Sequence, residues 1–233
     1  MDFYLYPIID WQYVKQNKIE LSSLYNVLLE RGFYQLRIKD LSLREVEEVI
    51  NHFNQLYKNI KIILNDYWQI FYKAQGIHLG IEDISKIDDL KAIFNSYSFS
   101  NSIEEWLKNQ GQYILGISTH NFEQFQNVYN IHKDYLGYLA IGPCFSTTTK
   151  KLNYDILNET EILRIMEFIV QEKIQQSIVF IGGINQDNLK KLYSLIETNV
   201  SIKNQIYYAS ISSFLRLEIP SKFNFTHNSK KKN

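Results

Sequence analysis

Short apolar segments recur along the whole chain, and amphipathic segments separate most of them. An apolar, β-branched or aromatic run bounded by Gly, Pro, Asn or Asp predicts a β-strand. Eight strands are predicted in this way, over residues 3–9, 33–38, 60–64, 76–79, 112–117, 135–141, 177–181 and 205–209. Segment 60–64 is apolar on both faces, which is typical of a strand in a parallel sheet that is covered on both sides.

Between the strands, apolar residues recur at helical spacing and polar residues mark the helix ends. Helices are predicted over residues 21–30, 42–57, 67–74, 103–108, 121–133, 156–171 and 185–198, and a last one starts near residue 212. Ser42 and Glu45 form the pattern of a capping box at the start of one of these helices. Strands that alternate with helices indicate an α/β protein with a parallel sheet.

The number of strands and the length of the chain favour one α/β fold. The chain has 233 residues, and a (β/α)8 TIM barrel typically has ~250. We therefore expect a single TIM barrel over residues 1–220, and an open doubly wound sheet is the alternative. Residues 84–113 are interpreted as an insertion between the fourth and fifth strands, and the lysine-rich residues 221–233 as a disordered tail.

Composition excludes several classes of function. The 25 basic and 25 acidic residues cancel, so the global charge does not favour nucleic acid or a membrane surface as a partner. A single cysteine excludes an internal disulfide and fits a reducing compartment. No apolar run approaches the ~20 residues of a membrane-spanning helix. We expect a cytoplasmic protein that acts on small molecules, and the sequence leaves open whether it forms a homo-oligomer.

Three polar side chains mark the end of the second predicted strand. Gln35, Arg37 and Lys39 are spaced by two residues, so they point to the same side of the strand. In a TIM barrel the active site forms where the strands end at their carboxyl side. Two cations that face such a site require an anionic ligand.

Carboxylates follow the next two predicted strands. Asn65 and Asp66 follow the third strand, and Asp83 follows the fourth. Carboxylates from neighbouring strands, opposite two cations, suit a Mg²⁺ ion that also binds phosphate oxygens. The alternative for Asn65 and Asp66 is a cap for the helix that starts next.

Hydroxyl groups, glycines and a lysine follow the later strands. The residues of interest are Ser118, His120, Thr147, Thr149, Lys150, Gly183 and Ser210. Hydroxyls and an ammonium group bind phosphate oxygens, and paired glycines let backbone N–H groups approach a phosphate. The alternatives are a solvated Ser/Thr loop and, for His120, a local hydrogen-bonding role. The residues alone indicate a barrel enzyme that binds one monophosphate and a second, metal-bound polyphosphate.

These motifs are more specific as an ordered set than any one of them is alone. The set comprises Gln35-Leu-Arg37-Ile-Lys39, Asn65-Asp66, His78-Leu-Gly80-x-Glu-Asp83, Ser118-Thr-His120, Gly142-Pro-Cys-Phe-x-Thr147-x-Thr149-Lys150 and Ile181-Gly-Gly-Ile184. Over residues 3–215 it resembles the thiamine phosphate synthase family. The resemblance implies transfer of a hydroxymethylpyrimidine group from its diphosphate to the nitrogen of a thiazole phosphate, with pyrophosphate leaving first.

The resemblance also implies a role for each residue. The diphosphate would be held by Gln35, Arg37, Lys39, Asn65 and Lys150, and Mg²⁺ by Asp66 and Asp83. The substrates would be lined by Ser118, Thr147 and Thr149, and the thiazole phosphate would bind the backbone at Gly183 and Ser210. Among these residues, Lys150, Arg37 and Ser118 would take part most directly in catalysis.

The sequence departs from the family pattern at a few positions. Ile81 stands where the family usually has Gln, Ser146 where it has Pro, and the eighth strand reads Tyr-Tyr-Ala-Ser. The insertion 84–113 is also longer than usual. Two other functions remain open: a thiazole tautomerase that uses His120, and a paralogue that binds thiamine precursors without turnover. The Gln before Arg37 and the complete Thr-x-Thr-Lys pattern favour the synthase.

Overall fold

The computed structural model describes residues 3–85, 87, 90–146, 154–197 and 206–223. Ten strands lie in this part of the chain and form one sheet. They are β1 (Phe3–Leu5), β2 (Ile8–Asp10), β3 (Phe33–Arg37), β4 (Lys61–Asn65), β5 (Gly76–Gly80), β6 (Ile114–Thr119), β7 (Leu136–Ile141), β8 (Ser177–Ile181), β9 (Ile206–Ala209) and β10 (Lys222–Phe223). All neighbours from β2 to β9 pair in parallel. Every predicted strand is confirmed, and the first is split into β1 and β2.

The sheet closes through the split first strand. β1 pairs with β9, whereas β2 pairs with β3 at the other end of the strand order. Only Tyr6 and Pro7 separate β1 from β2: the Tyr6 N–H donates to the Tyr208 carbonyl (2.9 Å), and the Pro7 carbonyl accepts from the Gln35 N–H (2.9 Å). Proline has no N–H, so the ladder is interrupted there. The split strand and seven others form a closed eight-stranded barrel, which excludes the open sheet.

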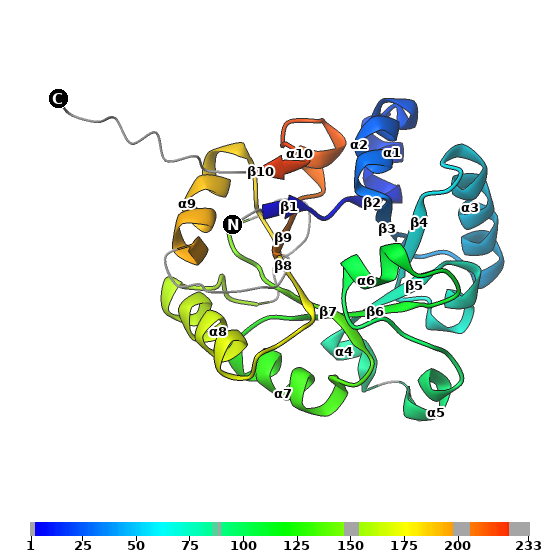
Figure 1. Cartoon of the computed structure of the whole chain (residues 1–233). Coiled ribbons are helices and arrows are strands. Elements are labelled where there is room, and N and C mark those ends of the chain that lie inside the picture. Colours follow the sequence, from blue (N-terminus) through cyan, green and yellow to red (C-terminus); the bar gives the residue numbers. More distant parts are fainter. Residues whose placement is uncertain (1–2, 86, 88–89, 147–153, 198–205, 224–233) are drawn as a thin grey trace.

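Helices surround the barrel (Figure 1). They are α1 (Trp11–Asn17), α2 (Tyr25–Arg31), α3 (Leu43–Leu56), α4 (Ile81–Ile84), α5 (Leu90–Asn95), α6 (Ile103–Lys108), α7 (Phe122–His132), α8 (Glu159–Gln171), α9 (Gln186–Glu197) and α10 (Ser212–Leu215), with 3₁₀-helices η1 (Leu21–Leu24) and η2 (Trp68–Lys73). The capping box of Ser42 and Glu45 is present at α3. In the described part of the chain, no helix is both long and apolar enough to cross a membrane.

Several elements differ from the expectations, among them α4 and α5, which were not predicted. α1 was not predicted, because only Val14 of its seven residues is buried and no apolar stripe forms. The helix expected at 67–74 is the 3₁₀-helix η2. The tail expected from residue 221 is wrong for its first residues, since Lys222 and Phe223 form β10 and pair antiparallel with β1. Residues 224–233 lie outside the described residues.

Alternate residues of each strand face two separate apolar layers, as the two-residue period requires. The outer layer lies between strands and helices and contains Leu36, Leu64 and Ile77. The inner layer fills the barrel and contains Phe33, Ile63, Tyr138, Val179 and Tyr207. The barrel is therefore a packed core, and a ligand can enter only at its end.

The segment between β5 and β6 closes the amino end of the barrel. Its helix α6 buries Trp106 completely against the inner layer, and α6 is seen near the centre of the ring of strands in Figure 1. The Trp106 Nε1–H donates to the Gln75 carbonyl (3.1 Å), and the Ile103 N–H donates to the Ser177 hydroxyl (3.0 Å). Gln75 and Ser177 stand at the amino ends of β5 and β8. The opposite, carboxyl end of the barrel is left for a site.

Candidate active site at the carboxyl end of the barrel

A cavity of about 830 Å³ opens at the carboxyl ends of the strands. Its lining contains most of the residues predicted from the sequence, namely Gln35, Arg37, Lys39, Asn65, Asp66, Asp83, Ser118, Gly183 and Ser210. Thr147, Thr149 and Lys150 lie outside the described residues. Ser146 and Tyr154, which flank that loop, both line the cavity. Residues far apart in the sequence thus meet in one site. Gln35, Arg37 and Lys39 all line it, as the two-residue spacing predicted.

The cavity has a floor without charged groups. The floor residues come from six strands and are Ile8, Gln35, Asn65, His78, Ile181 and Ala209. Gln35 is 2% exposed and Asn65 7%, so these amides lie deep in the barrel. Among the described residues, the Gln35 Nε2 group has no hydrogen-bond partner. An unpaired buried donor typically costs about 1–3 kcal/mol, and a ligand acceptor would remove that cost.

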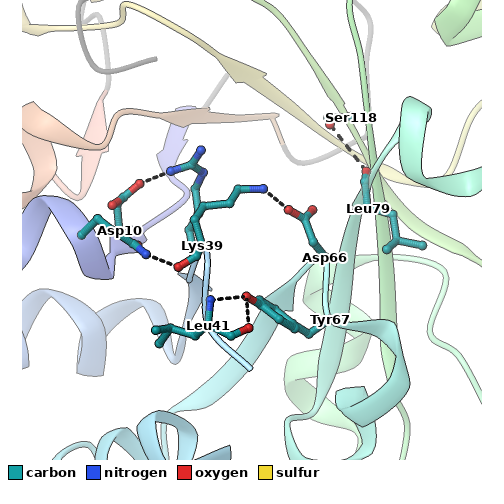
Figure 2. Close-up of polar contacts among 9 residues, drawn as sticks. Asp10, Lys39, Leu41, Asp66, Tyr67, Leu79 and Ser118 are labelled. Atoms are coloured by element: carbon teal, nitrogen blue, oxygen red, sulfur yellow. Dashed lines mark hydrogen bonds and ion pairs between the residues drawn. The ribbon is translucent and has the colours of Figure 1, made fainter. Parts of the chain in front are cut away.

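Charged side chains form the rim above the floor. Arg37 pairs with Asp10, and Lys39 pairs with Asp66, as Figure 2 shows. The side chains of Arg37, Lys39 and Asp66 are 20%, 40% and 23% exposed, so they remain partly hydrated. Floor and rim therefore offer a ligand two chemically different environments within one cavity.

Asp10 was missed by the sequence analysis, which ended the first strand at residue 9. Its side chain is 5% exposed, pairs with Arg37 and accepts from the Tyr13 N–H (2.9 Å) as the N-cap of α1. A buried carboxylate with two such partners is fixed in place, and it fixes the guanidinium in turn. The sequence feature that could have identified Asp10 is an acidic residue directly after an apolar strand.

The segment that carries Lys39 is held from both sides. The Gln12 side chain of α1 donates to the Lys39 carbonyl. The Tyr67 hydroxyl donates to the Leu41 carbonyl (3.0 Å) and accepts from the Leu41 N–H (3.3 Å), which is visible in Figure 2. These hydrogen bonds fix the backbone at Lys39, although this residue lies beyond the end of β3.

Asp66 has an unusual backbone and an unusual environment. Its φ of 68° lies in the left-handed region, which few residues other than Gly, Asn and Asp adopt readily. Burial, foremost, raises the pKa of the Asp66 carboxyl, and the charge of Asp83 raises it further, while Lys39 and Arg37 lower it. The two carboxylates therefore repel each other electrostatically, and both line the cavity.

The opposite wall contains Ser118, His120 and Tyr154. The Ser118 hydroxyl donates weakly to the Leu79 carbonyl (3.5 Å). His120 Nδ1 lies 2.9 Å from the Gly142 carbonyl, its ring stacks on Tyr154 at 3.6 Å, and its Nε2 lies 3.9 Å from Glu82. His120 therefore braces the start of the Thr/Lys loop, which agrees with the local role left open for it.

The glycine pair after β8 forms the remaining wall. Gly182 and Gly183 have φ of 96° and 66°, and a Cβ on Gly183 would lie 2.3 Å from the Ser146 carbonyl oxygen. Only glycine fits there. The side chain of Asn185 caps α9 by accepting from two backbone N–H groups at 2.9 and 3.1 Å. Ser210 follows β9 and is 7% exposed. This arrangement suits a phosphate group.

The departures from the family pattern lie mostly away from the cavity. Ile81 packs against the outer apolar layer and is outside the cavity lining. Tyr207 and Tyr208 are buried in the inner and outer layers, and only Ala209 and Ser210 of that segment line the cavity. Ser146 does line the cavity.

Comparisons with known proteins agree with this geometry. The family described as thiamine monophosphate synthase (TMP-TENI) matches residues 5–202. The thiamine-phosphate synthase of Proteus mirabilis is 33% identical over 84% of this chain and 77% of its own length, and that of Photorhabdus laumondii is 31% identical over the same shares.

Among solved structures, a tryptophan synthase α-subunit from Pyrococcus furiosus matches with a TM-score of 0.54, over 92% of this chain and 89% of its own. At 12% identity, that likeness concerns the fold alone, and it agrees with a TIM barrel. The family match covers most of the chain and includes β2 to β8, whereas β9, which also lines the cavity, lies beyond its last residue. The chain belongs to the thiamine monophosphate synthase family.

Proposed function

We propose that this protein is a thiamine-phosphate synthase. It would transfer a hydroxymethylpyrimidine group from its diphosphate to the ring nitrogen of a thiazole phosphate. The observation that carries the proposal is the division of one cavity into an uncharged floor and a charged rim. A flat heterocycle suits the floor, and its diphosphate would extend to Arg37 and Lys39.

This orientation refines the assignments for two residues. Gln35 and Asn65 lie on the floor, 2% and 7% exposed, whereas Arg37 and Lys39 lie at the rim. We therefore assign the two amides to the edge of the pyrimidine ring and the two cations to the diphosphate. Lys150 is expected to join the cations, and Thr147 and Thr149 to contact the substrates.

The residues present fit a Mg²⁺ ion. Among the described residues no group of three or more His, Cys, Asp or Glu side chains is arranged to hold a metal. Mg²⁺ usually binds through one or two carboxylates and takes its other ligands from substrate phosphates and water. Asp66 and Asp83 line the same cavity, and their charges interact, so they could supply those two carboxylates. When bound, the ion would neutralise charge on the diphosphate oxygens.

The chain's own residues would act mainly through charge and position. The carbon–oxygen bond to the diphosphate breaks, and the electron pair leaves with pyrophosphate. The thiazole nitrogen then supplies the pair for the new carbon–nitrogen bond. Arg37, Lys39 and Lys150 would stabilise the charge that grows on the leaving group. The backbone around Gly183 and Ser210 would hold the thiazole phosphate within reach.

A single cysteine agrees with the reducing environment of the cytoplasm, where we expect the protein to act. Both proposed substrates are small phosphorylated heterocycles. Cys144 is buried, and burial raises the pKa of its thiol to about 12, so the side chain is an inert part of the core.

One assay tests the proposal directly. The purified protein would be incubated with the pyrimidine diphosphate, the thiazole phosphate and Mg²⁺, and thiamine monophosphate and pyrophosphate would be quantified. We expect both products in equal amounts, and none when either substrate is omitted. Isomerisation of a thiazole phosphate without coupling would refute the proposal and favour a tautomerase. Tight binding of both substrates without turnover would refute it in favour of a binding protein.

A further inference from the structure

Three buried side chains form a hydrogen-bonded chain beneath the cavity floor. The Tyr6 and Tyr138 hydroxyl oxygens are 2.6 Å apart, and the Tyr138 hydroxyl is 2.9 Å from Nδ1 of His78. The two tyrosines are 1% and 0% exposed, and His78 is 7% exposed and lines the cavity. The reaction described above uses neither tyrosine, so this row of hydrogen bonds requires another explanation.

Packing determines where these rings lie. The Tyr138 ring crosses Gly116 so closely that a Cβ there would lie 1.8 Å from its Cζ atom. The planes of Tyr138 and His78 are 16° apart, with centroids at 5.7 Å. The Tyr6 ring contacts Phe33 edge-on at 5.3 Å. These contacts leave the three polar atoms little freedom to move apart.

The hydrogen bonds that join Tyr6, Tyr138 and His78 can run in either of two directions of proton donation. Burial, foremost, raises the pKa of both tyrosine hydroxyls above the ordinary value of 10.0, so each keeps its proton. Among the described residues, Tyr138 is the one hydrogen-bond partner of the Tyr6 hydroxyl. If His78 Nδ1–H donated to Tyr138, and Tyr138 to Tyr6, the Tyr6 proton would have no acceptor there.

The opposite direction gives both hydroxyl protons an acceptor. Tyr6 donates to Tyr138, Tyr138 donates to Nδ1 of His78, and the imidazole proton resides on Nε2. An unsatisfied buried donor costs about 1–3 kcal/mol, so the second direction is favoured. The hydrogen bond at one ring nitrogen of a histidine decides the protonation of the other.

We propose that Tyr6 and Tyr138 are positioning residues that hold His78 as its Nε2–H tautomer, a neutral hydrogen-bond donor at the cavity floor. Resting on the proposed function, this inference assigns His78 to an acceptor atom on the edge of the pyrimidine ring. The Gln35 amide is a second buried donor on the same floor, with Ile8, Ile181 and Ala209 as the apolar remainder. A flat heterocycle with nitrogen acceptors at its edge matches both kinds of surface.

The tautomer can be observed without substrate. Two-bond ¹H–¹⁵N correlation spectra of protein with labelled histidines report which ring nitrogen carries the proton, and the chain has only five histidines. The spectrum of His78→Gln assigns the signal. We expect Nε2–H in the wild type and in Tyr6→Phe, because Tyr138 still donates there. The Nε2–H tautomer should be lost in Tyr138→Phe, because this variant keeps the ring over Gly116 but has no hydroxyl to donate to His78.

Ligand binding tests the role of the tautomer, independently of turnover. Calorimetry with Mg²⁺ should show the dissociation constant of the pyrimidine diphosphate rising about tenfold in Tyr138→Phe, the size of one net hydrogen bond. Binding of inorganic pyrophosphate should not change, because it contacts only the rim. Tyr34→Phe is the matched control: Tyr34 is equally buried, and its hydroxyl has no partner among the described residues.

Two results would overturn the inference. An Nδ1–H signal in the wild type would reverse the hydrogen-bond direction. Equal loss of affinity for pyrophosphate and pyrimidine diphosphate in Tyr138→Phe would mean general damage to the barrel rather than a lost contact with the ring. Neither readout requires catalysis, so absence of coupling activity in the wild type would refute the proposed function alone.

Discussion

Replacing Asp66 by Asn should separate the role of this residue in the reaction from its role in the fold. Asn keeps the size of the side chain and tolerates the left-handed backbone at φ 68°, which Ala would not do as readily. The change removes one negative charge beside Lys39 and Asp83. Any effect therefore reports on charge and metal binding.

The two expected magnitudes differ widely. The Lys39–Asp66 pair is 40% and 23% exposed, and a partly exposed pair contributes about 0.2–1 kcal/mol. Removing the carboxylate also relieves its burial, so the free energy of unfolding should change by under ~1 kcal/mol. Loss of a Mg²⁺ ligand should remove about 3–4 kcal/mol of transition-state stabilisation, which lowers kcat by roughly 10²–10³-fold.

Coupling rates at saturating Mg²⁺ and urea denaturation on the same preparation would measure both effects. Asp40→Asn is the matched control, because Asp40 has a similar backbone (φ 57°), follows Lys39 and lies outside the cavity lining. Near wild-type coupling in Asp66→Asn would refute the metal-ligand assignment. A loss of several kcal/mol in stability would mean that Asp66 is chiefly structural.

The same variant gives a prediction for pH. Because the pKa of Asp66 is raised above 3.8 in the folded protein, the folded state binds this proton more tightly than the unfolded state does. The stability contributed by the protonated group is fully present below pH 3.8 and is lost as pH rises through the folded pKa. Asp66→Asn should therefore gain stability relative to wild type as pH rises over that interval, measured by urea denaturation at each pH. A constant difference would contradict the raised pKa.

The remaining predictions concern other parts of the molecule. Lys150→Ala should lower the single-turnover coupling rate by about 10²-fold, whereas the adjacent Lys151→Ala should not; equal rates would remove the loop from the site. His120→Ala should keep coupling within about tenfold of wild type, because loss of a general base would cost 10²–10⁴-fold, and a loss of that size would reverse the assignment. Trp106→Ala should destabilise the protein by ~3–5 kcal/mol in thermal and urea unfolding, whereas the exposed Lys108→Ala should not; a small effect would mean that α6 is dispensable.

Much of the fold was accessible from the sequence because barrel strands are apolar on both faces. Each strand contributes to an inner and an outer layer, so runs such as 60–64 stand out. The missed elements lack that signal: α1 buries only Val14, and β10 has two residues at an edge. The closure of the amino end by α6 depends on contacts between Trp106 and residues from distant strands, which no local sequence pattern reveals.

The candidate site could be predicted from the sequence to a similar extent. Gln35, Arg37 and Lys39 were predicted to share a side from their spacing, and carboxylates at strand ends were recognisable by position. Partners could not be predicted, because they depend on the barrel closing. The Tyr6–Tyr138 and His78–Tyr138 contacts join residues 132 and 60 positions apart. The sequence did indicate His78 within a motif, but not the hydroxyl behind it.

The two rim cations are not equivalent, and the difference bears on how a diphosphate could bind. Arg37 is paired with the buried carboxylate of Asp10, which also caps α1. Moving Asp10 away from Arg37 would therefore disturb the helix. Lys39 is paired with Asp66, which is more exposed and whose ionised form is already disfavoured by burial. An incoming diphosphate with Mg²⁺ offers each member of this second pair a new partner, phosphate oxygen for Lys39 and metal for Asp66. Arg37 would then keep the ligand in place, while the Lys39–Asp66 pair opens to admit it.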